Sequence, residues 1–149
     1  MTDTQANKEV VRAFIDGLFS EGDPAAVDRY LSEDFVNHDP PFGASTDREG
    51  MRAAGSTFRA AFPDWHSKLH LLIAEGDLVA EVFTARGTHR GEMMGVAATG
   101  RDVSLRGINV FRVRGGRITE RWGRLDDLGF IQQLGLAPSA GEARSSEAS

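Results

Sequence analysis

The sequence contains no cysteine, two lysines, one tyrosine and no long hydrophobic run. The absence of cysteine excludes disulfide bonds, thiol nucleophiles and thiolate metal sites. No apolar stretch reaches the ~18 residues of a membrane span, so we expect none. The first residues lack a basic region followed by an apolar segment, which gives no sign of a secretion signal. A cytoplasmic location is therefore the default expectation.

Acidic residues outnumber basic ones, and the net charge of −5 disfavours non-specific binding to nucleic acid. No phosphate-binding loop, dinucleotide fingerprint or nucleophile-elbow motif occurs. His66 and His70 are four residues apart, but on a strand they would lie more than ~10 Å from each other. We therefore expect no metal and no cofactor.

Apolar spacing divides the chain into helices followed by strands, the pattern of an α+β domain. Helical spacing of apolar residues covers residues 4–20, and Asp23-Pro24 begins a second short helix. Thr46 or Asp47 caps a third helix that ends near Pro63. The expected strands are 66–74, 78–89, 103–114 and 117–125. We expect one domain over residues 1–137 and a disordered tail over 138–149, which is small and polar.

The segment from Ser104 to Gly135 is the most informative part of the chain. Two apolar-alternating runs flank Gly115-Gly116, a typical two-residue hairpin turn. The second run contains Trp122, and Asp126 follows just before a helical pattern. A carboxylate at the end of a strand, behind a large aromatic residue, is a plausible place for acid/base chemistry.

Several short motifs in this order resemble the SnoaL-like polyketide cyclases of the nuclear transport factor 2-like superfamily. They are 34–40 (DFVNHDP), 87–92 (GTHRGE), 98–103 (ATGRDV), 117–122 (RITERW) with Asp126, and 132–135 (QQLG). The resemblance covers residues 8–135. It implies a cone-shaped α+β barrel, with a curved, mostly antiparallel sheet whose concave side is covered by helices. It also implies acid/base chemistry on an aromatic polyketide in a hydrophobic pocket.

Asp126 is the leading catalytic candidate, because the resemblance assigns a general acid/base to the aspartate after the tryptophan. Strict alternation along the last strand places Ile118, Glu120, Trp122, Arg124 and Asp126 on one face, unless a bulge intervenes. Burial beside an apolar wall would raise the pKa of Asp126. The alternative is that Asp126 or Asp127 caps the helix that begins near Leu128.

Four polar residues are further candidates. The resemblance places Asn37 and His38 near the pocket, as an enolate-stabilising donor and a proton relay; both are also typical of a simple turn. His89 lies at the end of a strand, either at the pocket rim or in solvent. Asn109 lies among apolar neighbours on its strand face, as a core amide or a substrate donor. Apolar candidates for the pocket wall are Trp65, Trp122, Phe35, Met93 and Phe111.

The resemblance leaves four functions open. Asp126 could begin an intramolecular aldol cyclisation, or a hydroxylation of an anthracycline-type polyketide, since both start with proton abstraction. Epoxide opening, the third, would need an Asp-Arg-Asp set that Arg124 and Asp126 supply only in part. A binding or dimerisation module without catalysis is the fourth. We also expect a homodimer, because Arg106, Ile108, Val110 and Arg112 form an outer strand face too apolar to be fully solvated.

Overall fold

The computed structural model describes residues 2–136, with only the backbone of Phe42 described; the expected tail over 138–149 lies outside these residues. The helical elements are α1 (Asp3–Ile15), the π-helix η1 (Asp16–Ser20), α2 (Ala25–Tyr30), the 3₁₀ turn η2 (Pro41–Gly43), α3 (Arg48–Ala61) and α4 (Asp127–Gln133). The strands are β1 (Leu31–Asn37), β2 (His66–Glu75), β3 (Leu78–Thr88), β4 (Asp102–Arg114) and β5 (Arg117–Leu125).

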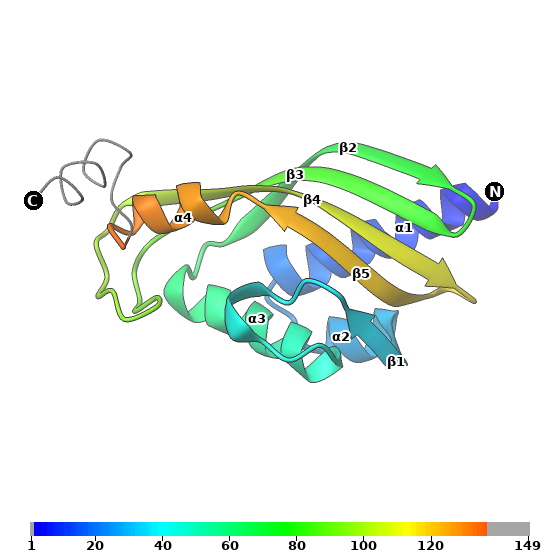
Figure 1. Ribbon diagram of the computed structural model, residues 1–149, viewed down its shortest axis with the longest axis horizontal. Helices are drawn as coiled ribbons and strands as arrows, with labels where there is room; N and C mark the ends of the chain where they lie inside the picture. The colour runs from blue at the N-terminus through cyan, green and yellow to red at the C-terminus, as the bar shows by residue number, and fades with distance from the viewer. Residues whose placement is uncertain (1, 137–149) are drawn as a thin grey trace, which may run out of the picture.

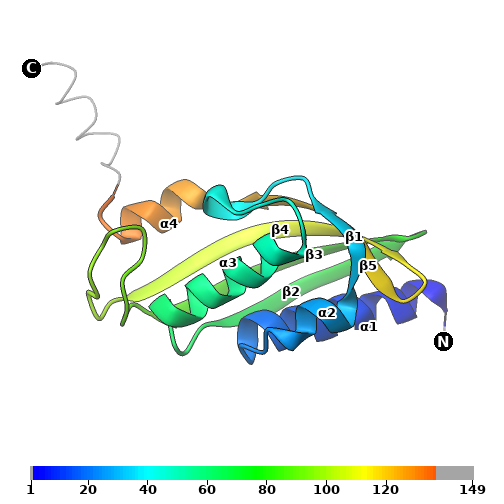
Figure 2. The ribbon, with the colours of Figure 1, turned by 90° about the horizontal axis from the view of Figure 1, so that it is seen from below.

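The five strands form one curved sheet in the order β1-β5-β4-β3-β2. All neighbouring strands are antiparallel except β1, which pairs parallel with β5. The sheet is open, with β1 and β2 at its edges. Helices α1, α2 and α3 all lie on one side of it (Figure 1), and the view from below shows α1 and α3 crossing its concave face (Figure 2). The α+β cone expected from the sequence is confirmed, although the sheet does not close into a barrel.

Local signals placed most of the element ends correctly. Asp47 accepts a hydrogen bond from the backbone of Gly50 and caps α3. Gly115 and Gly116 both have positive φ, 57° and 78°, as a tight hairpin between β4 and β5 requires. The sequence pattern did not predict a strand at Leu31–Asn37, because this strand, β1, is held by pairing with β5 far along the chain. None of the helices within residues 2–136 is long and apolar enough to cross a membrane.

Two β-bulges change which side chains face inward. In β2, His70 is the extra residue, since Leu69 pairs with Phe83 and Leu71 with Val82. In β5, Thr119 is the extra residue, since Ile118 pairs with Val113 and Glu120 with Arg112. A bulge shifts the alternation by one residue. The expected common face for Ile118 and Asp126 is therefore wrong.

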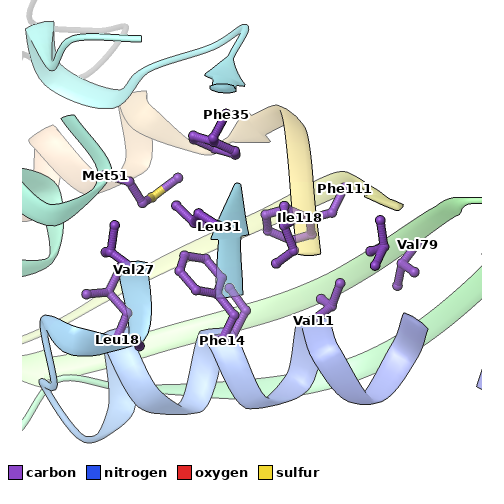
Figure 3. Close-up of a cluster of buried hydrophobic side chains, with 13 residues drawn as sticks. Val11, Phe14, Leu18, Val27, Leu31, Phe35, Met51, Val79, Phe111 and Ile118 are labelled. Atoms are coloured by element: carbon purple, nitrogen blue, oxygen red, sulfur yellow. The ribbon is translucent and has the colours of Figure 1, made fainter. Parts of the chain in front are cut away.

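The core consists of two apolar clusters between the helices and the concave face. The first joins α1, η1 and α2 to the sheet through Phe14, Leu31, Val79 and Phe111 (Figure 3). The second joins α3 and α4 to the other end of the sheet, and its centre is a stack of aromatic rings: Phe58, Phe62, Trp65 and Phe130. The candidate site lies where the two clusters meet.

Candidate functional site

A narrow cavity lies between the concave face of the sheet and the helices above it. Its walls come from α1 and η1 (Phe14, Ile15, Phe19), α3 (Met51, Ala54, Phe58), the turn at Pro41, Trp65, and the inward positions of β2 to β5 (Ser67, Glu81, Phe83, Ala85, Leu105, Asn109, Phe111, Arg121, Leu125). Most of these side chains are apolar. The exceptions in the sheet are Ser67, Glu81, Asn109 and Arg121.

The cavity is a slot. Its volume is about 60 Å³. A flat ring would fit only if the side chains of the walls moved apart. An apolar slot with a few polar groups is the usual form of a small-molecule site.

Glu81 is the buried acid in this slot. It has no exposed surface, and its Oε2 accepts a hydrogen bond of 2.9 Å from Asn109 Nδ2. Its other oxygen, Oε1, has no hydrogen-bond partner among the described residues. Burial raises the pKa of Glu81 from 4.5 to about 7, although the hydrogen bond from Asn109 and the charge of Arg121 oppose this shift. Glu81 is thus a carboxyl group that changes protonation near neutral pH.

Asn109 lies between Glu81 and Arg121. Its Oδ1 accepts two hydrogen bonds from Arg121, from Nε at 3.0 Å and from Nη2 at 2.7 Å. Glu81 and Asn109 pair directly across β3 and β4, and Phe111 pairs with Arg121 across β4 and β5. The three polar side chains therefore form a continuous line across the sheet. The strand register fixes their order.

Arg121 also holds the loop that follows β1. Its Nη1 donates to Asn37 Oδ1 at 3.0 Å and to the backbone oxygen of Asp39 at 2.7 Å. This loop leads into the turn whose Pro41 forms part of the cavity wall. The guanidinium is 5 % exposed, and burial lowers its pKa. Arg121 thus connects the acid in the cavity to the segment at its edge.

Gly123 makes room for this arrangement. A Cβ atom at Gly123 would clash with Arg121 Nη2, because the Arg121 side chain passes directly over the glycine. Arg121 is held there by its bonds to Asn109, Asn37 and Asp39. A side chain at this position would displace the guanidinium from the cavity.

The structure places Asp126 outside the cavity. Its Oδ1 accepts a hydrogen bond from the backbone of Gly129 and caps α4, and its Oδ2 pairs with Arg106 at 3.2 Å on the outer face of the sheet. The bond from Gly129, followed by the one from Arg106, lowers the pKa of Asp126. The expectation of a buried Asp126 with a raised pKa is therefore wrong. The bulge at Thr119 is the physical reason, because it turns Arg121, Gly123 and Leu125 inward in place of their neighbours.

Of the two adjacent aspartates, Asp126 is the one that caps the helix, and neither lines the cavity. Asp126 is the cap, and Asp127 is the first residue of α4. Desolvation raises the pKa of Asp127, while the charge of Arg121 lowers it. Asp127 is exposed and lies outside the cavity wall.

Asn37 and His38 point to opposite sides of the sheet. Asn37 is buried behind Arg121, and its side-chain oxygen accepts from Arg121 rather than facing the slot. His38 lies on the outer face, where its ring stacks on Trp122 with centroids 4.8 Å apart and its Nε2 lies 3.2 Å from Glu120 Oε1. Neither side chain lines the cavity, so the expected contacts of Asn37, His38 and Trp122 with the pocket are not found.

His89 is neither at the cavity rim nor in solvent. It is fully buried against Phe62, with ring centroids 5.5 Å apart, and its Nδ1 lies 3.0 Å from Thr99 Oγ1. Backbone bonds from His89 to Arg101 and from Gly100 to His89 close the loop between β3 and β4. His89 therefore anchors this loop.

The apolar candidates separate into three groups. Trp65 and Phe111 line the slot, as does Asn109. Phe35 packs into the first core cluster beside Leu31 and Met51 (Figure 3), and Met93 packs into the second. Trp122 lies on the outer face. Within residues 2–136, no group of three or more histidines and carboxylates has the arrangement of a metal site.

Comparison with known proteins identifies the family. The family model described as SnoaL-like polyketide cyclase matches residues 8–134, most of the chain. The chain belongs to the SnoaL-like polyketide cyclase family. A search of curated proteins finds no significant match.

Several solved structures have the same fold. TsrD from Streptomyces laurentii has a TM-score of 0.80 and 28% identity, over 92% of this chain and 100% of TsrD. AclR from Streptomyces galilaeus, a candidate hydroxylase, has a TM-score of 0.82 and 25% identity, over 99% and 95% of the two chains. IdmH from Streptomyces antibioticus, a candidate polyketide cyclase, has a TM-score of 0.75 and 34% identity, over 87% and 98%.

In this SnoaL-like chain, sequence reasoning missed both charged residues of the slot. Glu81 had a signal, because it stands between Val79 and Phe83 in a run where every second residue is apolar. An acid at an inward position of such a strand indicates a buried carboxyl group. Arg121 had no such signal, since the bulge at Thr119 reverses the alternation that would have located it.

Proposed function

We propose that this protein is a cofactor-free acid/base enzyme that acts on an aromatic polyketide intermediate in the cytoplasm, as a step of antibiotic biosynthesis. The reaction we favour is intramolecular aldol cyclisation. The observation that carries the proposal is the buried Glu81, which lines an apolar slot and whose Oε1 has no partner within residues 2–136. The family match and the candidate cyclase IdmH support the substrate class.

Glu81 is the general base in this mechanism. Its Oε1 removes a proton from the carbon next to a substrate carbonyl, and a pKa of about 7 suits a base that works near neutral pH. Asn109 occupies Oε2 and so leaves Oε1 to the substrate. Arg121 lines the same slot and supplies positive charge for the enolate oxygen that develops.

Ring closure then needs no further group. The enolate carbon attacks a second carbonyl of the same molecule, and the new alkoxide takes the proton back from Glu81. The product is an isomer of the substrate. The walls contributed by Trp65, Phe58 and Phe111 hold the chain folded, which removes much of the entropic cost of closure.

Hydroxylation is the second candidate, and the likeness to AclR favours it. The same carbanion, formed by Glu81, would add molecular oxygen to give a hydroperoxide, and a two-electron reductant such as a thiol would convert this into the alcohol and water. The two reactions differ in product mass, because cyclisation leaves it unchanged and hydroxylation adds one oxygen atom.

The test is mass spectrometry of products after incubation with a panel of tricyclic anthracycline precursors in air. We expect an isomeric product from the wild-type protein and its loss with Glu81→Gln. Asp126→Asn is the matched control, because it tests the base that the family resemblance suggests. Loss with Asp126→Asn but not with Glu81→Gln would move the chemistry to Asp126. Binding of a precursor without conversion by any variant would favour a binding module.

We also propose a homodimer formed through the outer face of the sheet. The strand register places Leu71, Ile73 and Ile108 on this face, where they are 55%, 60% and 47% exposed. No element within residues 2–136 covers them (Figure 1). Pairs of opposite charge flank the patch, Arg106 with Asp126 and Arg112 with Glu120. A second copy would present the same apolar centre and both charges.

A further inference from the structure

The slot has a second polar end, formed by Ser67. Ser67 lines the cavity, and its Oγ is buried without a hydrogen-bond partner among the described residues. The far side of the slot holds the other unpartnered oxygen, Glu81 Oε1. Buried polar atoms are nearly always hydrogen-bonded, so each of these two atoms needs an explanation.

Strand register gives the separation of the two ends. Ser67 pairs with Ala85 across β2 and β3, and Ala85 lies four residues from Glu81 on the same face of β3. Four residues of extended chain span about 13 Å. Between them the slot is walled by Phe83 and Leu105, which offer no hydrogen bond.

The Ser67 end is held rigidly. The backbone N–H of Ser67 donates to Ser20 Oγ at 3.0 Å. Beside it, Arg59 donates to the carbonyl oxygens of Phe19, Ser20 and Trp65 at 2.9 to 3.1 Å. These contacts join η1, α3 and the start of β2, and they hold the backbone at Ser67 in place.

We infer that Ser67 is a specificity residue, which binds a hydroxyl or carbonyl oxygen at the far end of the flat polycyclic ligand whose near end meets Glu81. This inference rests on the proposed function for the nature of the ligand. An apolar slot rejects little by shape alone, whereas a buried polar atom discriminates against ligands that leave it unpaired. The ligand class is therefore a linear fused-ring molecule with an oxygen substituent at each end.

The test uses two linear three-ring quinones, anthraflavic acid with a hydroxyl group at each end and its analogue with one hydroxyl only. The protein carries Trp122→Phe, so that Trp65 in the slot is the remaining tryptophan and reports binding by quenching. We expect anthraflavic acid to bind about threefold to tenfold more tightly than the analogue, the usual effect of one net hydrogen bond. Ser67→Ala should remove this preference, and Ser67→Thr should retain it.

The outcomes separate this inference from the proposed function. Equal affinity for the two quinones, a preference that survives Ser67→Ala, or no binding of either quinone would overturn the role of Ser67. The role of Glu81 as base is judged separately, by turnover of the Glu81→Gln variant. A loss of preference in Ser67→Ala combined with full turnover in Glu81→Gln would leave the specificity residue in place and refute the base.

Discussion

Replacing Glu81 by glutamine should make the protein more stable at high pH while it removes activity. The unfolded chain ionises a glutamate near 4.5, whereas Glu81 in the fold has a pKa of about 7. The folded protein therefore binds more protons than the unfolded chain between these two values. The contribution of protonated Glu81 to the stability is fully present below pH 4.5, and it is lost as the pH rises through about 7.

The magnitude follows from the two pKa values. One pKa unit corresponds to about 1.4 kcal/mol, so ionised Glu81 costs about 3 kcal/mol above neutral pH. Glutamine has nearly the same shape and keeps an oxygen that can accept from Asn109, but it cannot ionise. A constant cost for its buried NH₂ group does not vary with pH. The informative quantity is therefore the change in the difference between variant and wild type.

Urea unfolding of both proteins at several pH values between 4 and 9 measures this change. We expect the difference in free energy of unfolding, Glu81→Gln minus wild type, to be about 3 kcal/mol larger at pH 9 than at pH 4. Glu9→Gln on the exposed face of α1 is the control, and should follow wild type. Activity should fall by about 10²-fold to 10⁴-fold, the usual contribution of a general base. A stability difference that is the same at every pH would refute the assignment of the titrating group.

Three further predictions test the rest of the arrangement. Asp126→Ala should lower the free energy of unfolding by about 1 kcal/mol because the α4 cap is lost, whereas Asp126→Asn should keep the cap. A loss of turnover in Asp126→Asn without a loss of stability would contradict the capping role. Gly123→Ala should displace Arg121 and raise the pKa of Glu81 further, as followed by NMR titration of its side-chain carboxyl; an unchanged titration would show that the guanidinium had not moved. Ile108→Arg should dissociate the proposed dimer in light scattering, and a wild-type monomer at micromolar concentration would refute that interface.

The sequence predicted the fold well because its signals are local. The Gly115-Gly116 turn, the Asp47 cap and the apolar spacing of the helices depend on neighbouring residues, and the structure confirms them. The fold class also follows from the order of helices and strands. Only the pairing of β1 with β5 required information from distant parts of the chain.

The candidate site was predicted poorly because it depends on side-chain direction. One extra residue at Thr119 exchanges the two faces of β5, so that Arg121 enters the cavity and Trp122 leaves it. The same extra residue in β5 also places Asp126 on the outer face. No local propensity marks this bulge, since Thr119 is an ordinary strand residue.

The line from Glu81 through Asn109 to Arg121 differs from a structural ion pair. In a buried structural pair the two charges touch, because direct contact is what offsets their desolvation. Here Asn109 separates them and uses both ends of its amide to do so. Glu81 consequently keeps a raised pKa and, in the described part of the chain, an oxygen without a partner, at a cost of about 3 kcal/mol at high pH. A protein stabilised only by packing would gain from a residue that cannot ionise at this position, so the buried acid supports the catalytic role that we propose for it.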